Sequence, residues 1–192
     1  GIYYTLYPFQ EEAEAYVLCE EPSEEVGKYQ VENLSPDHRL HTRRIYTFFY
    51  QEKEQGFLFS GEAHPMLELT YVDQGVLHSV VDGQDTLLKQ GDMVIYGPNQ
   101  WHMQYADIGV APRFVTITFE TGGGDLTPLM NRKLAPPQRI VELLQKMLQE
   151  LERMDEFSQE IIVSHLDTLL LLLLRENITP SVGKLQGSNS VH

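Results

Sequence analysis

Two of the seven histidines, His64 and His102, stand among other potential metal ligands on sequence that is typical of β-strands. Glu62 precedes His64 and Glu68 follows it at even spacing, so on a pleated strand all three side chains would point to the same face. Two carboxylates and two imidazoles that converge inside a protein suit a divalent metal such as zinc, iron, manganese or nickel. The sequence therefore predicts that Glu62, His64, Glu68 and His102 meet in one site.

Three interpretations of this site stay open. In the first, the four residues hold a divalent metal (Zn, Ni, Fe or Mn). In the second, they form a pocket in which they hydrogen-bond directly to the hydroxyls or the amine of a small effector. In the third, they are ordinary barrel residues whose hydrogen bonds are satisfied within the protein. Glu68 is the residue most expected inside, because it lies in an otherwise apolar strand and an unpaired buried carboxylate is costly.

Three further residues are candidates for ligand binding. Tyr96 and Trp101 lie close to the second histidine in the sequence, and each either stacks on a bound ligand or serves in packing. Arg113 begins a strand, and it either binds an anionic effector or neutralises Glu68 or Glu62.

Residues 41–120 carry the pattern of a β domain. β-Branched and aromatic residues recur in short runs between glycine-containing turns, and Asp82-Gly83 is a strong signal for a hairpin. Strands are predicted at residues 45–50, 67–72, 76–81, 86–89, 93–96 and 113–120. Many short strands with regular turns and no helical period indicate a sandwich or a barrel.

The other segments differ in texture. Residues 1–40 are acidic and are predicted to form an N-terminal arm or edge strands, residues 121–135 a linker, and residues 136–177 a helical hairpin before the polar tail 178–192. The consecutive leucines Leu169–Leu174 would cover the whole circumference of the second helix. Such a helix is buried on two sides, so we expect a homodimer through these helices, with burial inside one chain as the alternative.

The spacing of Glu62, His64 and Glu68 resembles the first conserved motif of the cupin superfamily. That motif has a glycine, then His-x-His, a glutamate and a second glycine. Gly56, Glu62, His64, Glu68 and Gly75 fall at those spacings, with Glu62 in place of the first histidine.

The second cupin motif begins with a glycine and reaches a histidine eleven positions later, which matches Gly91 and His102. The sequence departs from this motif at Gly97, where proline is preferred, and at Ala106, where asparagine is usual. Together the two motifs imply a double-stranded β-helix, or jelly-roll, barrel in which three of the four usual metal ligands match in type.

The wider pattern is similar to the N-terminal sensor domain of AraC-type transcription regulators. A Glu-Leu-x-Tyr-Val-x-x-Gly strand, a Val-Asp-Gly hairpin and a Gly-Pro-Asn-Gln-x-His segment carry this resemblance, which covers about residues 41–176. It implies a mostly β fold with C-terminal α: a cupin barrel that binds a small polar metabolite such as a sugar, followed by two antiparallel helices that form the homodimer. It also implies a DNA-binding helix-turn-helix domain outside this chain, with residues 178–192 as the start of the linker to it.

Two other functions compete with the non-enzymatic sensor that this resemblance implies. One is a metal-dependent cupin enzyme, a dioxygenase or an isomerase, with the same four residues as ligands. Glu62 at the position of the first histidine and Ala106 at the position of the asparagine weigh against it. The other is a cupin domain that serves only as a dimer scaffold.

The charge balance excludes some partners. Fourteen Lys and Arg stand against 28 Asp and Glu, a net charge of −14, so this chain by itself is not expected to bind DNA or an anionic membrane. The single cysteine, Cys19, cannot form an intrachain disulfide, and no secretory signal or membrane span is recognised, so we expect a cytoplasmic protein. No nucleophile motif such as Gly-x-Ser-x-Gly supports covalent catalysis.

Overall fold

The computed structural model describes residues 34–36 and 39–178. All the helices and strands described below belong to the unit that begins at His38. Most of the predicted acidic arm and nearly all of the predicted linker tail lie outside the described residues.

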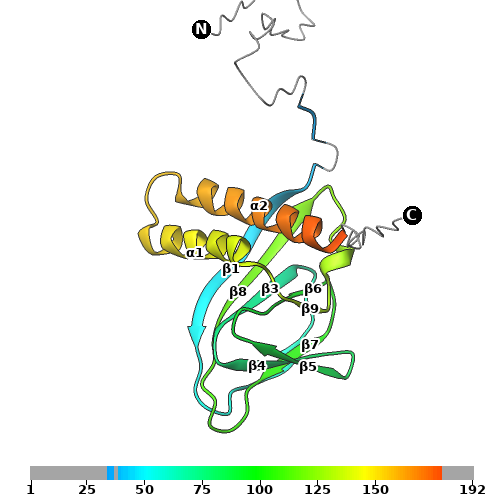
Figure 1. Ribbon diagram of the computed structural model, residues 1–192, viewed down its shortest axis with the longest axis vertical. Coiled ribbons are helices and arrows are strands. Elements are labelled where there is room, and N and C mark those ends of the chain that lie inside the picture. Colours follow the sequence, from blue (N-terminus) through cyan, green and yellow to red (C-terminus); the bar gives the residue numbers. More distant parts are fainter. Residues whose placement is uncertain (1–33, 37–38, 179–192) are drawn as a thin grey trace, which may run out of the picture. The chain divides into compact units, whose positions relative to one another are not determined.

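Two antiparallel sheets face each other to form a barrel, as the sequence predicts (Figure 1). The larger sheet has the order β1-β8-β3-β6-β9 and the smaller one the order β2-β7-β4-β5. The strands are β1 His41–Glu52, β2 Leu58–Glu62, β3 Leu67–Gln74, β4 Val76–Val81, β5 Gln84–Lys89, β6 Met93–Tyr96, β7 His102–Tyr105, β8 Arg113–Gly122 and β9 Lys133–Leu134.

The predicted hairpin at Asp82-Gly83 is confirmed. Val81 of β4 pairs with Gln84 of β5, and the two residues between them have φ values of 50° and 76°. Positive φ at both central residues is what a type I′ turn requires, and aspartate followed by glycine tolerates it. The predicted strands do not include β2 and β7, because both are short and their polar residues hide the strand pattern.

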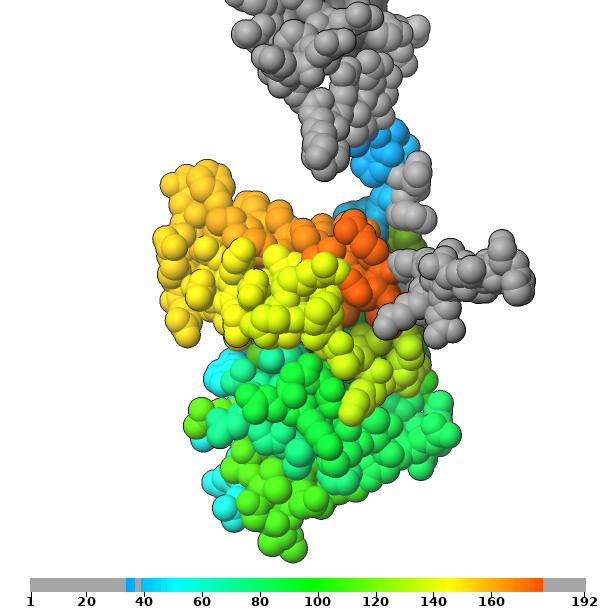
Figure 2. Space-filling view, in the orientation of Figure 1, coloured from blue at the N-terminus to red at the C-terminus, as the bar shows by residue number. Residues whose placement is uncertain are grey.

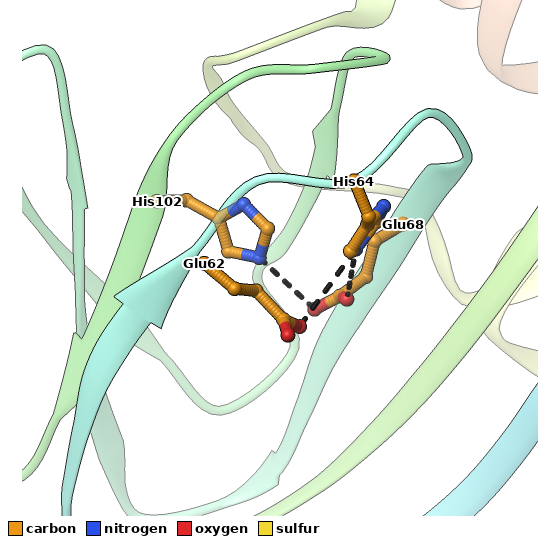
Figure 3. A group of neighbouring side chains, drawn as sticks. All are labelled: Glu62, His64, Glu68 and His102. Carbon is orange, nitrogen blue, oxygen red and sulfur yellow. Dashed lines mark hydrogen bonds and ion pairs between the residues drawn. The ribbon is translucent and has the colours of Figure 1, made fainter.

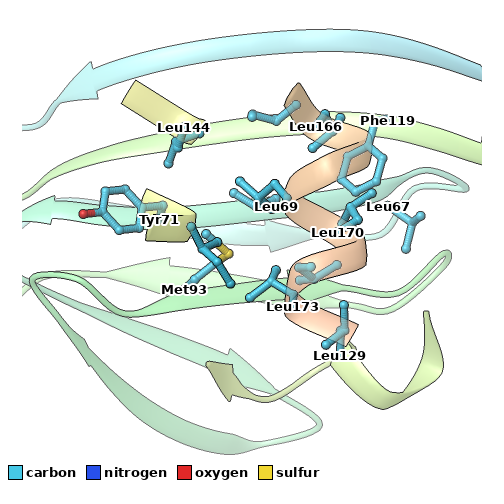
Figure 4. Packing of buried hydrophobic residues seen from close by; sticks show 14 of the residues in the cluster. Leu67, Leu69, Tyr71, Met93, Phe119, Leu129, Leu144, Leu166, Leu170 and Leu173 are labelled. Carbon is cyan, nitrogen blue, oxygen red and sulfur yellow. The ribbon is translucent and has the colours of Figure 1, made fainter. Parts of the chain in front are cut away.

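Strand β3 separates two apolar clusters. Leu67 and Leu69 point outward into the larger cluster, which the sheet forms with the helices (Figure 4). Val72 points inward into the smaller cluster between the two sheets. Because side chains alternate along a strand, Glu68 and Thr70 also face the inside of the barrel. One strand therefore contacts the barrel interior on one face and the helices on the other.

Two helices cover the outer face of the larger sheet: α1 Gln138–Arg153 and α2 Ser158–Ile178 (Figures 1 and 2). Pro137 caps α1 in an extended conformation, and the buried Ile140, Leu144 and Met147 recur at helical spacing. The Asp167 carboxylate of α2 accepts a hydrogen bond from the Thr42 N–H of β1 at 2.6 Å. The antiparallel hairpin expected after the barrel is present. Within the described residues, neither helix is long and apolar enough to cross a membrane.

The leucine run of α2 is buried largely within one chain. Leu169, Leu170 and Leu173 are fully buried against the sheet and α1, whereas the side chain of Leu171 is 42% exposed. The sequence predicts that α2 is buried on two sides, and α1 provides most of the second contact surface. Burial inside one chain, which the sequence left as the alternative, accounts for most of the run.

The segment 121–135 differs from the linker predicted for it. It contains the end of β8, the 3-10 helix η1 Thr127–Leu129 and the short strand β9. Leu126, Leu129 and Leu134 are buried in the larger cluster. These three leucines pack the connection against the sheet. The glycines that precede them in the sequence indicate a flexible linker instead.

Candidate functional site

Glu62, His64, Glu68 and His102 form one cluster, in which a donor atom of each lies within 4.8 Å of the donors of the other three (Figure 3). His64 Nε2 lies 3.1 Å from Glu68 Oε2 and 3.8 Å from Glu62 Oε1. His102 Nε2 lies 3.6 Å from Glu68 Oε1. The structure therefore brings together all four residues that the sequence singled out, and Glu68 contacts both imidazoles.

The four residues converge for a different reason from the one the sequence suggested. Glu62 ends β2, where it lies opposite His102 of β7 in the smaller sheet, whereas Glu68 belongs to β3 in the larger sheet. His64 lies in the connection between β2 and β3. The expectation that Glu62, His64 and Glu68 share one face of a single strand is therefore wrong, since two facing sheets bring them together.

A bulge at the end of β2 directs Glu62 toward the cluster. The register with β7 shifts between Phe59 and Glu62, and Gly61 lies within the shift with φ of 109°. A Cβ on Gly61 would overlap the ring of Trp101. Trp101 is 45% exposed, so its placement on Gly61 fits packing at the rim of the cluster.

Both imidazoles turn Nε2 toward the cluster. His64 Nδ1 lies 3.1 Å from the Met66 carbonyl, and His102 Nδ1 lies 3.0 Å from the Gln100 carbonyl. A carbonyl only accepts, so each Nδ1 carries the proton and donates it, which orients each Nε2 as metal-ligating histidines are oriented. His102 Nε2 is buried and has no hydrogen-bond partner among the described residues. This unpaired atom beside Glu68 fits a bound divalent cation, which accepts both imidazole nitrogen and carboxylate oxygen.

A network of buried polar residues supports the cluster from behind. The Tyr96 ring stacks on His102 with centroids 3.9 Å apart, and its hydroxyl bonds to Ser79 at 2.7 Å. Gln104 donates to the Tyr96 hydroxyl and to Thr70 at 3.1 and 3.0 Å. Burial raises the pKa of Tyr96 to about 12, so this hydroxyl stays protonated. Tyr96 thus holds the His102 ring and lies in the interior.

The sequence reasoning missed Gln104, Thr70 and Ser79. A signal for the first two was present, because Gln104 shares its strand face with His102 and Thr70 shares its face with Glu68. The strand β7 was not predicted, so this parity could not be applied to Gln104.

Arg113 lies away from the cluster. Arg113 is in β8 and pairs with Gln74 of β3. Glu68, which also belongs to β3, pairs instead with Thr118 of β8. The Arg113 guanidinium contacts Glu52 of β1 at 3.2 Å. The expectation that Arg113 neutralises Glu68 or Glu62 is therefore not met, because the antiparallel register carries it to the other end of β8.

The protonation of His102 makes the stability of the metal-free fold depend on pH. Burial alone would lower the pKa of His102, but the carboxylates of Glu68 and Glu62 and the Gln100 carbonyl hold it above its usual value. A raised folded-state pKa stabilises the fold fully at pH values below the unfolded-state pKa of about 6.5, and this contribution is lost as pH rises through the folded-state pKa.

In EDTA-treated protein, we expect urea unfolding to show that the wild type is more stable than His102→Gln by a larger margin at about pH 5.5 than at about pH 8. A difference between the two proteins that does not change with pH would contradict this assignment.

Residues 51–107, which carry Glu62, His64, Glu68 and His102, match the family model of the cupin domain. The chain contains a cupin domain. None of the curated proteins compared with this chain matches it.

Solved structures similar to this cupin domain come from proteins of different kinds. ToxT from Vibrio cholerae shares 8% identity over 71% of this chain and 57% of its own, with a TM-score of 0.50. The cupin domain of an XRE family transcriptional regulator from Enterobacter cloacae shares 18% identity over 38% of this chain and 79% of its own, with a TM-score of 0.35. Oxalate decarboxylase from Bacillus subtilis shares 15% identity over 40% of this chain and 23% of its own, with a TM-score of 0.34. At these identities the likeness shows the fold alone.

Proposed function

We propose that this cupin domain is the effector-binding and dimerisation domain of an AraC-type transcription regulator, whose DNA-binding domain lies outside this chain. The observation that carries the proposal is the double role of β3. Glu68 on its inner face contacts His64 and His102, while Leu67 and Leu69 on its outer face pack in the cluster that contains the helices (Figures 3 and 4).

This arrangement gives an effector a short route to the helices. A ligand that changes the position of Glu68 also acts on the adjacent residues Leu67 and Leu69 of β3, which belong to the same apolar cluster as Leu166 and Leu170 of α2 (Figure 4). An effector that binds one arrangement of strand and helices more tightly shifts the population toward it. In a regulator, such a shift would alter the spacing of attached DNA-binding domains, and no covalent step is needed.

In this proposal Glu62, His64, Glu68 and His102 hold a divalent metal, with zinc, nickel, iron or manganese as candidates. When bound, the metal supplies a Lewis acid to which the hydroxyl or carboxylate oxygen of an effector binds. The chain itself orients the two imidazoles through the Met66 and Gln100 carbonyls.

The lining of the barrel favours a polar effector. Thr70 and Gln104 lie next to the cluster. Thr118 of β8 lies opposite Glu68 and hydrogen-bonds to Thr47 of β1 at 2.6 Å. ToxT, which matches over most of this chain, was solved with an unsaturated fatty acid bound. That structure supports a small molecule as effector, whereas the polar side chains around Glu68 favour a small polar metabolite such as a sugar over a fatty acid.

The state of association tests this proposal. We expect the purified chain to sediment as a dimer, and we expect Leu171→Asp to sediment as a folded monomer, because Leu171 is the exposed leucine of the α2 run. Gln149→Asp, at an exposed position of α1, is the matched control and should stay dimeric. Equilibrium sedimentation measures both, with circular dichroism as the check of folding. A wild-type chain that is monomeric at every concentration tested contradicts a dimerisation domain.

A metal-dependent cupin enzyme is the second candidate, because the same four donors would serve it. Metal content after dialysis and oxygen uptake with a panel of small organic acids separate the two. Stoichiometric iron or manganese that survives dialysis, together with substrate-dependent oxygen uptake, would favour the enzyme over the sensor.

A further inference from the structure

A cavity of about 240 Å³ lies in the barrel beside Tyr96, and none of the four cluster residues lines it. Ser79, Leu88 and Val94 contribute its walls from β4, β5 and β6. Ser79 is buried and bonds to the Tyr96 hydroxyl, and the ring of Tyr96 stacks on His102. The cavity and the four-residue cluster are therefore two separate places, with Tyr96 between them.

The cavity exists because the two sheets do not join at this side. β5 is the edge strand of the smaller sheet, and β9, with two residues, is the edge of the larger one. Lys133 of β9 reaches across to the Leu87 carbonyl of β5 at 3.5 Å. This leaves an opening between the two edge strands, and inward-facing side chains of β4, β5 and β6 line that opening.

Two basic residues, Arg132 and Lys133, line the β9 end of the cavity, and both are solvent-exposed. Lys133 Nζ contacts Asp92 Oδ2 at 2.9 Å, and Arg132 donates to the Pro128 carbonyl and to Asn177 Oδ1, both at 2.8 Å. A guanidinium has five N–H donors and an ammonium has three, so both groups keep donors for a ligand after these contacts. Cations held in place in this way are suited to a carboxylate, since little side-chain freedom is lost on binding.

Two further residues of the lining can hydrogen-bond to hydroxyls. Asp82 lies in the β4–β5 hairpin, and its Oδ1 accepts one hydrogen bond from Gln100 at 2.9 Å, so carboxylate acceptor capacity is left over. Thr86 adds a hydroxyl on the wall of β5. The volume is below the roughly 300–1,000 Å³ of sites for drug-sized ligands, which favours a small metabolite.

We propose that this cavity binds a small hydroxycarboxylic acid. Its carboxylate pairs with Arg132 and Lys133, and its hydroxyls bond to Thr86 and Asp82. Binding here needs no metal, so this site adds a second ligand to the one proposed for the metal cluster and stands independently of it.

Titration of EDTA-treated protein with D-gluconate tests this site, with D-sorbitol as the probe of the same carbon number that lacks the carboxylate. We expect calorimetry to show gluconate binding and sorbitol binding at least about tenfold weaker, because the two charge-assisted pairs are lost. Thr86→Phe fills the cavity and should weaken gluconate binding by about tenfold or more. Leu87→Phe places the same ring on the outer face of the same strand and should leave it unchanged. Arg132→Gln serves if Thr86→Phe does not fold, and it should weaken gluconate binding without changing that of sorbitol.

Each other result overturns the site. The proposed binding site is wrong if gluconate does not bind, or if it binds equally well to Thr86→Phe. The proposed preference for a carboxylate is wrong if gluconate binds no better than sorbitol. Gluconate that binds after metal loading and not before belongs to the metal cluster. Because Glu68→Gln should remove metal binding and leave gluconate binding intact, failure of this site and failure of the proposed metal centre give different results.

Discussion

Replacing Glu68 with glutamine is expected to weaken divalent-metal binding by about 100-fold or more. Glu68 is buried and contacts both imidazoles of the cluster, at 3.1 Å for His64 and 3.6 Å for His102. Glutamine keeps the shape of the side chain, but it removes the negative charge and places an N–H₂ donor toward the metal position. Competition of EDTA-treated protein with a chromogenic chelator, for zinc and for manganese, measures the change in affinity.

Glu120→Gln is the matched control for this substitution. Glu120 lies on β8, half exposed, where it pairs with Arg43 at 3.5 Å, so its loss removes the same charge from the chain without touching the cluster. The control should bind metal as the wild type does. Equal affinities for all three proteins would mean that the four residues do not form a metal site and that the network only satisfies buried polar groups.

Truncation of Leu170 to alanine is expected to destabilise the chain by about 2–5 kcal/mol. Leu170 is fully buried in the cluster between the larger sheet and the helices, so the substitution removes its apolar contacts and leaves a cavity that the packed strands and helices do not readily fill (Figure 4). Urea unfolding followed by circular dichroism measures the change in the free energy of unfolding.

The neighbouring Leu171→Ala gives a sharp comparison, because the residue type and helix are the same and only burial differs. With a side chain that is 42% exposed, Leu171 should change the unfolding free energy of the folded monomer by about 0.5 kcal/mol or less. If Leu171→Ala costs as much as Leu170→Ala under conditions where the protein is monomeric, then α2 is buried on a face that the structure leaves open.

Much of the β architecture could be predicted from local sequence. β4 and β6 were predicted at their observed bounds, because β6 is a short apolar run, β4 is rich in valine, and each ends at turn residues. The Asp82-Gly83 turn was predictable for the same reason, since its chemistry depends on two residues. By contrast β2 and β7 escaped prediction, although Glu62 and His102 belong to them, because four or five residues with mixed polarity carry too little signal.

The sequence by itself determined which residues form the candidate site: two imidazoles and two carboxylates at cupin spacing. Only the tertiary structure decided how they meet, because Glu62 and His102 are paired in one sheet while Glu68 comes from the other. It also decided that Arg113 pairs with Glu52 and that α1 supplies most of the second buried side of the leucine helix. Spacing along the chain sets the face on which a side chain lies. The partner across that face depends on strand register and on the packing of sheets and helices, which join residues far apart in sequence.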